Sequence, residues 1–171
     1  GMYKDFESAN IIGTQNVVKF ATKFNLNLLH VSTLSVSGNN FADGSHVEEV
    51  FETDVDYSEN NFYIGQNVEG LYAKSKFEAE HIVLDAIYSS GLKATILRMG
   101  NLTSRFSEGK FQQNHFENAF VNRFKSFLQI GYAPDYMMGL YAEFTPIDYC
   151  GDAIIEIARH FNPNYTVFHL M

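Results

Sequence analysis

Two short apolar runs separated by a long segment with helical periodicity are the feature that most constrains the fold of this chain. The first run, "LNLLHVSTLSVSG" (26–38), ends in small hydroxylated residues and a glycine, and the second, "KATILRMGNLT" (93–103), ends in a Gly-Asn turn. Residues 72–90 between them place apolar side chains on one broad face, and Gly91 follows as a stop signal. Runs of this length suit buried strands. The order strand, helix, strand therefore predicts a right-handed parallel crossover and an α/β sheet.

The rest of the chain extends this unit with further helices and a closing strand. We predict helices over residues 6–24, 115–131 and 147–161, a strand over 165–170, and a long acidic loop over 39–61 with an edge strand around 49–53. In the helix predicted at 115–131, phenylalanines recur every four residues along one face, which we assign to the core. Asparagines recur with the same spacing along a neighbouring face. The two sets are Phe116, Phe120, Phe124 and Asn114, Asn118, Asn122.

Composition favours one domain, 1–171, and excludes several kinds of site. With 171 residues and 46% hydrophobic content the chain can bury a core, while its apolar runs are too interrupted to span a membrane, so we expect a cytoplasmic protein.

The net charge is −8 and the basic residues are scattered, so we expect no nucleic-acid partner. No histidine pair has a metal-binding spacing, so we expect no metal. Cys150 is the only cysteine, which excludes an internal disulfide and suggests a small buried residue.

Tyr72 and Lys76, in "GLYAKSKFEAE", lie four residues apart near the start of the predicted helix. They can share one face and point into one site. A nearby ammonium favours the phenolate, so we expect Lys76 to lower the pKa of Tyr72 from about 10 and to make it a usable proton donor. The other interpretation is an exposed pair on an amphipathic helix. The strand end "HVSTLSVSG" favours chemistry, because ligands gather at the C-terminal edge of a parallel sheet, where these hydroxyls would lie.

Together, the strand-end hydroxyl, the tyrosine and the lysine resemble the proton-transfer residues of the extended short-chain dehydrogenase/reductase superfamily. Similar motifs run through "ANIIGTQNVVKFA", "YAKSKFEAE", "ILRMGNL" and "FTPIDYCGDAI". The resemblance implies the C-terminal part of a Rossmann-like, doubly wound parallel sheet with helices on both faces. It also implies that Thr33, rather than Ser32 or Ser35, hydrogen-bonds the substrate carbonyl oxygen.

By the same resemblance, Tyr72 would protonate that oxygen, and Lys76 would hold the nicotinamide ribose and tune the tyrosine. The turn formed by Met99, Gly100, Asn101 and Leu102 resembles a family turn whose backbone lies by the nicotinamide carboxamide, with Met99 in place of the usual proline.

Within the superfamily, "GLKATILRMGNLTSR" and "LQIGYAPDY" are most similar to the thioester reductase domains of nonribosomal peptide synthetases. Such domains reduce a peptidyl or acyl thioester, held on the phosphopantetheine arm of a carrier domain, with NADPH. The resulting hemithioacetal releases an aldehyde, which is sometimes reduced further to an alcohol. The Asn114 region would lie toward the substrate, although a plain helix-surface role also fits those asparagines.

No strand followed by GxxGxxG or GxGxxG occurs in the sequence, whereas the family carries that loop on its first strand. We therefore expect a partial reductase domain that lacks the N-terminal glycine-rich βαβ unit, with its pyrophosphate site, and part of the substrate subdomain. Such a fragment should be inactive alone. Two alternatives stay open: a fragment of a sugar-nucleotide epimerase or dehydratase, and a noncatalytic binding module of the same fold.

Overall fold

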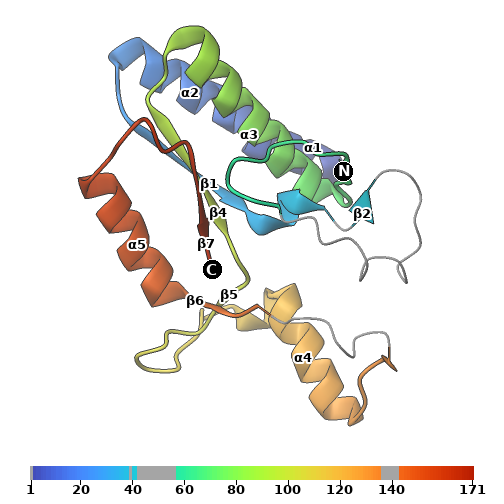
Figure 1. Ribbon diagram of the computed structural model, residues 1–171. Coiled ribbons are helices and arrows are strands. Elements are labelled where there is room, and N and C mark those ends of the chain that lie inside the picture. Colours follow the sequence, from blue (N-terminus) through green and yellow to red (C-terminus); the bar gives the residue numbers. More distant parts are fainter. Residues whose placement is uncertain (1, 39, 42–56, 136–142) are drawn as a thin grey trace.

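A three-stranded parallel sheet forms the centre of the computed structural model, which describes residues 2–38, 40–41, 57–135 and 143–171 (Figure 1). The strands stand in the order β1-β4-β7 and span Leu28–Thr33, Ala94–Met99 and Val167–Leu170. The helix α3, Leu71–Ser90, connects β1 to β4. The predicted strand, helix and parallel strand are thus confirmed, and so is the closing strand.

The first helical segment is longer than predicted and contains an irregular turn. It runs through α1 (Met2–Phe6), the π-helical segment η1 (Glu7–Ile12) and α2 (Gly13–Phe24). Asn25 ends it in the left-handed conformation at φ 50°, a position where asparagine is tolerated better than most residues. The predicted helix at 6–24 is confirmed in position, but its sequence pattern did not reveal the π turn.

Helices cover both faces of the sheet. On one face, α2 and α3 bury an apolar cluster against the early halves of β1 and β4, made of Val18, Ala21, Val83, Ala86, Leu92, Ala94 and Ile96. On the other face, α5 (Ile147–Arg159) packs Cys150 against Leu97 and Met99 of β4. The predicted Rossmann-like arrangement is therefore confirmed, and Cys150 is buried as expected.

Shorter elements connect these layers. A 3₁₀ turn η2 (Leu34–Ser37) follows β1, and two small two-stranded sheets lie outside the main sheet. One pairs β2 (Asn40–Phe41) with β3 (Gln66–Asn67) and is antiparallel, and the other pairs β5 (Leu102–Thr103) with β6 (Thr145–Pro146) and is parallel. The edge strand that we predicted around residues 49–53 lies outside the described residues.

The predicted helix at 115–131 is interrupted near its start. A 3₁₀ turn η4 (His115–Glu117) comes first, and Asn118 then caps α4 (Ala119–Ile130) by accepting a hydrogen bond from the Val121 N–H at 3.0 Å. A capping asparagine breaks the helical register, because its side chain satisfies backbone donors at the helix start. Asn114 therefore does not share a helical face with Asn118 and Asn122, and that prediction is wrong.

The phenylalanines of this region do not form the core that we predicted. Phe116 is 64% exposed. Phe120 and Phe124 are half-buried, and their rings pack against each other and against Phe144, with centroids 4.9 to 5.3 Å apart. The physical reason is position, because α4 lies beyond the carboxyl ends of the main strands rather than against the sheet (Figure 1).

A buried ion pair joins α3 to β4. Arg98 and Glu80 are both fully buried, with Nη2 donating to Oε2 at 2.8 Å and Nε to both carboxylate oxygens at 3.1 and 3.2 Å. Arg98 also bonds the Asn61 carbonyl at 3.0 Å, lies 3.3 Å from His169 Nε2, and stands 4.8 Å from the ring centre of Tyr57. A charge removed from water needs such a full set of partners. This network therefore ties one helix, two strands and the 57–62 segment together.

Candidate active site

The candidate site lies where β1 ends and α3 begins. Thr33 is the last residue of β1, and its Oγ1 accepts a hydrogen bond from the Ser35 N–H at 3.2 Å. The parallel register pairs Thr33 with Met99, so the turn after β4 emerges beside it. Parallel strands present their carboxyl ends at one edge, which is where ligands bind in this kind of sheet. The structure thus brings Thr33, Tyr72 and the turn after Met99 to one edge.

Alternation along β1 separates the three hydroxylated candidates. Ser32 points to the opposite face of the strand from Thr33, as neighbouring strand residues do, and its buried Oγ has no hydrogen-bond partner among the described residues. Ser35 contacts Thr33 through its backbone and its hydroxyl. The geometry therefore favours Thr33 over Ser32 as the hydroxyl at the candidate site, with Ser35 hydrogen-bonded to it.

Tyr72 is half exposed, and its ring meets the edge of the Phe6 ring at a centroid distance of 6.2 Å. Burial raises the pKa of Tyr72 above its ordinary value, and a hydrogen bond with the Thr33 side chain lowers it by less. Our prediction that Lys76 lowers this pKa is wrong for the chain as it stands. Desolvation of the phenol decides the direction, and Lys76 is not among the groups that shift it.

Lys76 is directed toward β1. Its Nζ donates to the Val31 carbonyl at 3.0 Å, which uses one of the three N–H bonds of an ammonium group. Burial lowers the pKa of Lys76, and Glu80, one turn further along α3, opposes this shift. The lysine is thus anchored to the strand that carries Thr33, and its ammonium makes one hydrogen bond among the described residues.

His30 lies two residues before Ser32 on the same side of β1. Burial lowers its pKa to about 4, and the charge of Lys76 contributes in the same direction. The imidazole is therefore neutral at ordinary pH. Sequence reasoning missed this residue because an isolated histidine in an apolar strand carries no motif.

The turn at residues 99–102 is held closely by its surroundings. The Gly100 N–H donates to the Leu170 carbonyl at 2.9 Å, and the Asn101 N–H donates to Glu143 Oε2 at 2.5 Å. A Cβ at position 100 would collide with the side chains of Thr145 and Glu143, so only glycine fits without displacing them. The backbone N–H groups of Gly100 and Asn101 are both engaged within the chain, so the turn would meet a carboxamide through other atoms.

Asn10 and Phe6 also reach the site, and sequence reasoning did not assign them to it. Asn10 Nδ2 donates to Ser75 Oγ at 2.8 Å, and Ser75 in turn donates to the Tyr72 carbonyl at 2.7 Å. Helical periodicity alone could not have placed them there, because the contact joins residues 65 positions apart. The only available signal was that "ANIIGT" belongs to one of the resemblance motifs.

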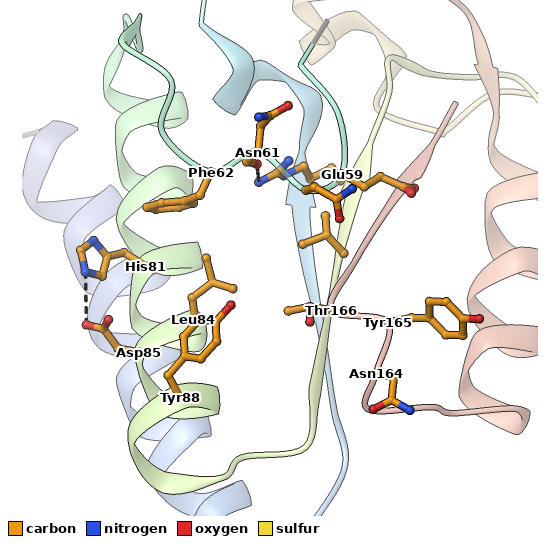
Figure 2. A pocket seen from close by; sticks show the side chains of 13 residues that line it. Glu59, Asn61, Phe62, His81, Leu84, Asp85, Tyr88, Asn164, Tyr165 and Thr166 are labelled. Atoms are coloured by element: carbon orange, nitrogen blue, oxygen red, sulfur yellow. Dashed lines mark hydrogen bonds and ion pairs between the residues drawn. The ribbon is translucent and has the colours of Figure 1, made fainter.

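A separate cleft of about 440 Å³ lies on the α3 side of the sheet, away from these residues. Figure 2 shows Leu84 and Tyr88 of α3 along one wall, with Asn164, Tyr165 and Thr166 opposite. At its rim, His81 Nε2 lies 3.2 Å from Asp85 Oδ2. None of Thr33, Tyr72 and Lys76 lines it. The cleft is therefore distinct from the candidate site.

Metal-binding clusters and membrane-spanning helices are both absent from the part of the chain that the structure describes. No group of three or more histidine, cysteine, aspartate or glutamate side chains is arranged there to hold a metal ion. Nor does any helix in those segments combine the length and the apolar character that crossing a bilayer requires.

Comparison with known proteins decides the family. A model of an NAD-binding family described as "Male sterility protein" matches residues 1–154. The chain belongs to this family. Membership of an NAD-binding family supports a nicotinamide cofactor for the site described above.

Two solved structures that are similar to this chain at 30% identity or more are reductase domains. The reductase domain of the aureusimine biosynthetic cluster is 30% identical with a TM-score of 0.83, and the match covers 98% of this chain and 43% of that one. A thiolation-reductase di-domain from an archaeal nonribosomal peptide synthetase is 33% identical with a TM-score of 0.77, over 95% of this chain and 42% of that one. These matches confirm the predicted resemblance to reductase domains of nonribosomal peptide synthetases.

Curated relatives are much longer proteins. The non-canonical nonribosomal peptide synthetase cpsA of Aspergillus campestris is 29% identical over 159 residues, which are 92% of this chain and 14% of that protein. A dTDP-glucose 4,6-dehydratase from Streptomyces venezuelae, solved with NAD bound, matches at 19% identity with a TM-score of 0.62. That likeness shows the fold alone, so the epimerase or dehydratase alternative is the weaker one.

Proposed function

We propose that this chain carries the proton-transfer residues of an NADPH-dependent thioester reductase that releases a carrier-bound peptidyl or acyl group as an aldehyde or alcohol. The observation that carries the proposal is the meeting of Thr33, Tyr72 and Lys76 at the carboxyl edge of a parallel sheet. Reductase domains at 30% and 33% identity, each matched over nearly the whole of this chain, support the choice of reaction.

In this proposal each of the three residues has its own role in the reduction. The Thr33 hydroxyl hydrogen-bonds the thioester carbonyl oxygen, and Tyr72 donates a proton to that oxygen as its negative charge develops. NADPH, when bound, supplies the hydride. The raised pKa of Tyr72 suits a donor, because the phenol keeps its proton until the oxygen becomes basic.

Lys76 would hold the cofactor ribose and stabilise the phenolate after proton transfer. Its donor set fits a nicotinamide ribose, because one N–H is fixed to the Val31 carbonyl and the other two can each meet a hydroxyl. NADPH rather than NADH, the phosphopantetheine thioester and the carrier-domain partner are parts of the proposal. The archaeal relative in which a thiolation domain is joined to a reductase supports the carrier.

The proposal includes a longer reductase of which this chain is a part, here called the full-length parent. The decisive experiment loads the carrier domain of that parent with an acyl thioester and follows NADPH oxidation and aldehyde release. Tyr72→Phe should lower turnover by roughly 10²- to 10⁴-fold, because it removes the proton donor and leaves the ring in place. Tyr88→Phe is the matched control, since Tyr88 is 82% exposed at the far end of the same helix. Equal turnover in Tyr72→Phe and wild type would remove Tyr72 from the mechanism. Turnover of a sugar nucleotide but not of the thioester would favour the epimerase.

A further inference from the structure

We propose that Glu143 is a positioning residue that holds the turn at residues 99–102 in place against the nicotinamide ring of the cofactor. The inference rests on the proposed function, because it takes NADPH to bind at the edge where β1 and β4 end. Glu143 itself transfers no proton in this role. It acts through the backbone of the turn.

The turn lies beside the place where hydride has to arrive. Met99 is the register partner of Thr33, and neighbouring strands of a sheet lie about 4.8 Å apart. The nicotinamide has to come within about 3–3.5 Å of the carbonyl carbon whose oxygen Thr33 would bond. The residues that follow Met99 therefore border the position of the ring.

The Glu143 carboxylate bridges the turn and a neighbouring strand. It accepts a hydrogen bond from the Asn101 N–H at 2.5 Å through Oε2, and another from the Thr145 hydroxyl through Oε1. Asn101 belongs to the turn, whereas Thr145 begins β6. Hydrogen bonds to an ionised acceptor are stronger than those between neutral groups. The carboxylate thus ties the peptide between Gly100 and Asn101 to β6.

The surroundings of Gly100 show how closely this side chain packs on the turn. A Cβ at position 100 would collide with the side chains of both Glu143 and Thr145. Two backbone bonds hold other atoms of the turn, from the Gly100 N–H to the Leu170 carbonyl at 2.9 Å and from the Thr145 N–H to the Asn101 carbonyl at 3.0 Å. The contact at the Asn101 N–H is made by a side chain, so a substitution can remove it and leave the backbone bonds intact.

Phe144 directs Glu143 toward the turn. The Phe144 ring packs against the rings of Phe120 and Phe124 on α4, with centroids 5.3 Å apart in both pairs. The next residue along the chain thus faces α4, while Glu143 faces Asn101, which lies 42 positions earlier in the sequence. The aromatic cluster on α4 therefore helps to fix where the carboxylate lies.

The test compares two ligands of the full-length parent by calorimetry. One is NADPH, and the other is adenosine 2′,5′-bisphosphate, which resembles the adenosine half of NADPH and has no nicotinamide. Glu143→Leu keeps the size of the side chain and accepts neither hydrogen bond. It should weaken NADPH binding about 10-fold and leave the affinity for the bisphosphate unchanged. A general loss of structure would weaken both.

Glu143→Gln is the conservative variant. Its carbonyl oxygen can accept from Asn101, and its amide can donate to the Thr145 oxygen, since a hydroxyl can also accept. It should therefore bind NADPH within about threefold of wild type. Glu156→Leu is the matched control, because Glu156 is exposed on α5. Wild-type affinity for NADPH in Glu143→Leu, or equal losses for the two ligands, would overturn the inference.

Amide hydrogen exchange at residues 100–103 tests the same contact with no ligand present. Glu143→Leu should exchange faster there than wild type and than Glu156→Leu, and unchanged exchange would refute the hold on the turn. If the wild-type parent bound no NADPH, the proposed function would fail, and with it the role toward the nicotinamide. Faster exchange in Glu143→Leu would then leave only the contact with the turn standing.

Discussion

The helix α3 carries two polar clusters one turn apart, and they are built in opposite ways. Glu80 is fully buried and its carboxylate accepts three hydrogen bonds from Arg98. Tyr72 and Lys76 are partly exposed, and among the described residues the Lys76 ammonium makes a single hydrogen bond, to the backbone carbonyl of Val31. The first cluster is saturated with partners from its own chain. The second keeps donors available for a ligand.

The contrast teaches how one helix can serve both stability and chemistry. A buried charge with every partner in place holds the helix to the sheet, and removing one partner leaves the other uncompensated. A half-exposed polar group with fewer hydrogen bonds to its own chain contributes less to the stability of the fold. Its pKa depends on how far it is buried and on the charges beside it. Substitutions in the buried cluster should therefore lower stability, whereas substitutions in the half-exposed cluster should lower turnover.

The largest expected effect is on stability, from Glu80→Ala. Arg98 would become an unpaired buried charge, so the free energy of unfolding should fall by about 3–5 kcal/mol. Denaturant titration measures it, with Glu78→Ala as an exposed control on the same helix. A loss no larger than that of the control would mean that the buried pair does not hold α3 to the sheet.

His30 should make stability depend on pH. Its folded pKa of about 4 lies below the ordinary 6.5, so the unfolded chain binds the proton more tightly. Stability is therefore fully present above about pH 6.5 and falls as pH drops toward 4, by roughly 3 kcal/mol for a shift of this size. Thermal unfolding midpoints from pH 7 to 4 should fall less steeply in His30→Leu. Parallel curves for the two proteins would contradict the buried, neutral histidine.

Lys76→Met tests the open cluster. Turnover of the parent should fall by about 100-fold, or about 2.7 kcal/mol of barrier, because the ammonium no longer holds the ribose or stabilises the phenolate. The unfolding midpoint should change little, since the methionine keeps the apolar stem of the side chain. Lys74→Met, exposed two residues earlier, is the control. Equal losses of turnover and stability would erase the difference between the two clusters.

The smallest effect concerns Asp148, a partly exposed carboxylate that accepts several hydrogen bonds. It accepts hydrogen bonds from the N–H groups of Phe106 and Ser107 at 3.0 and 3.1 Å, and these lower its pKa to about 2. This contribution is present above about pH 4 and is lost as pH falls through 2. Asp148→Asn should speed amide exchange at residues 106 and 107 and leave the unfolding midpoint nearly unchanged. If amide exchange at residues 106 and 107 were no faster than in the control Asp152→Asn, Asp148 would not be what holds those two N–H groups.

Much of the fold could be predicted from local pattern. The apolar runs that became β1 and β4, the helix between them and the amphipathic stretch that became α5 all have periodicities that a short window reveals. The phenylalanines around α4 were misassigned, because periodicity indicates an apolar face but not what covers it. The π turn at η1 and the capping role of Asn118 were missed for a related reason, since both depend on where a helix packs and begins.

By itself, the sequence determined the order of the elements and the residue types at the site, because strand and helix periods and the Tyr-Lys spacing are local properties of the chain. The tertiary structure decided which groups meet. It placed Thr33 beside Tyr72 and brought Asn10 to Ser75, 65 residues further along the chain. It also directed Lys76 to the Val31 carbonyl, so that burial and not Lys76 sets the direction in which the pKa of Tyr72 shifts. Burial and long-range hydrogen bonds depend on distances in the folded protein, and no spacing along the chain specifies them.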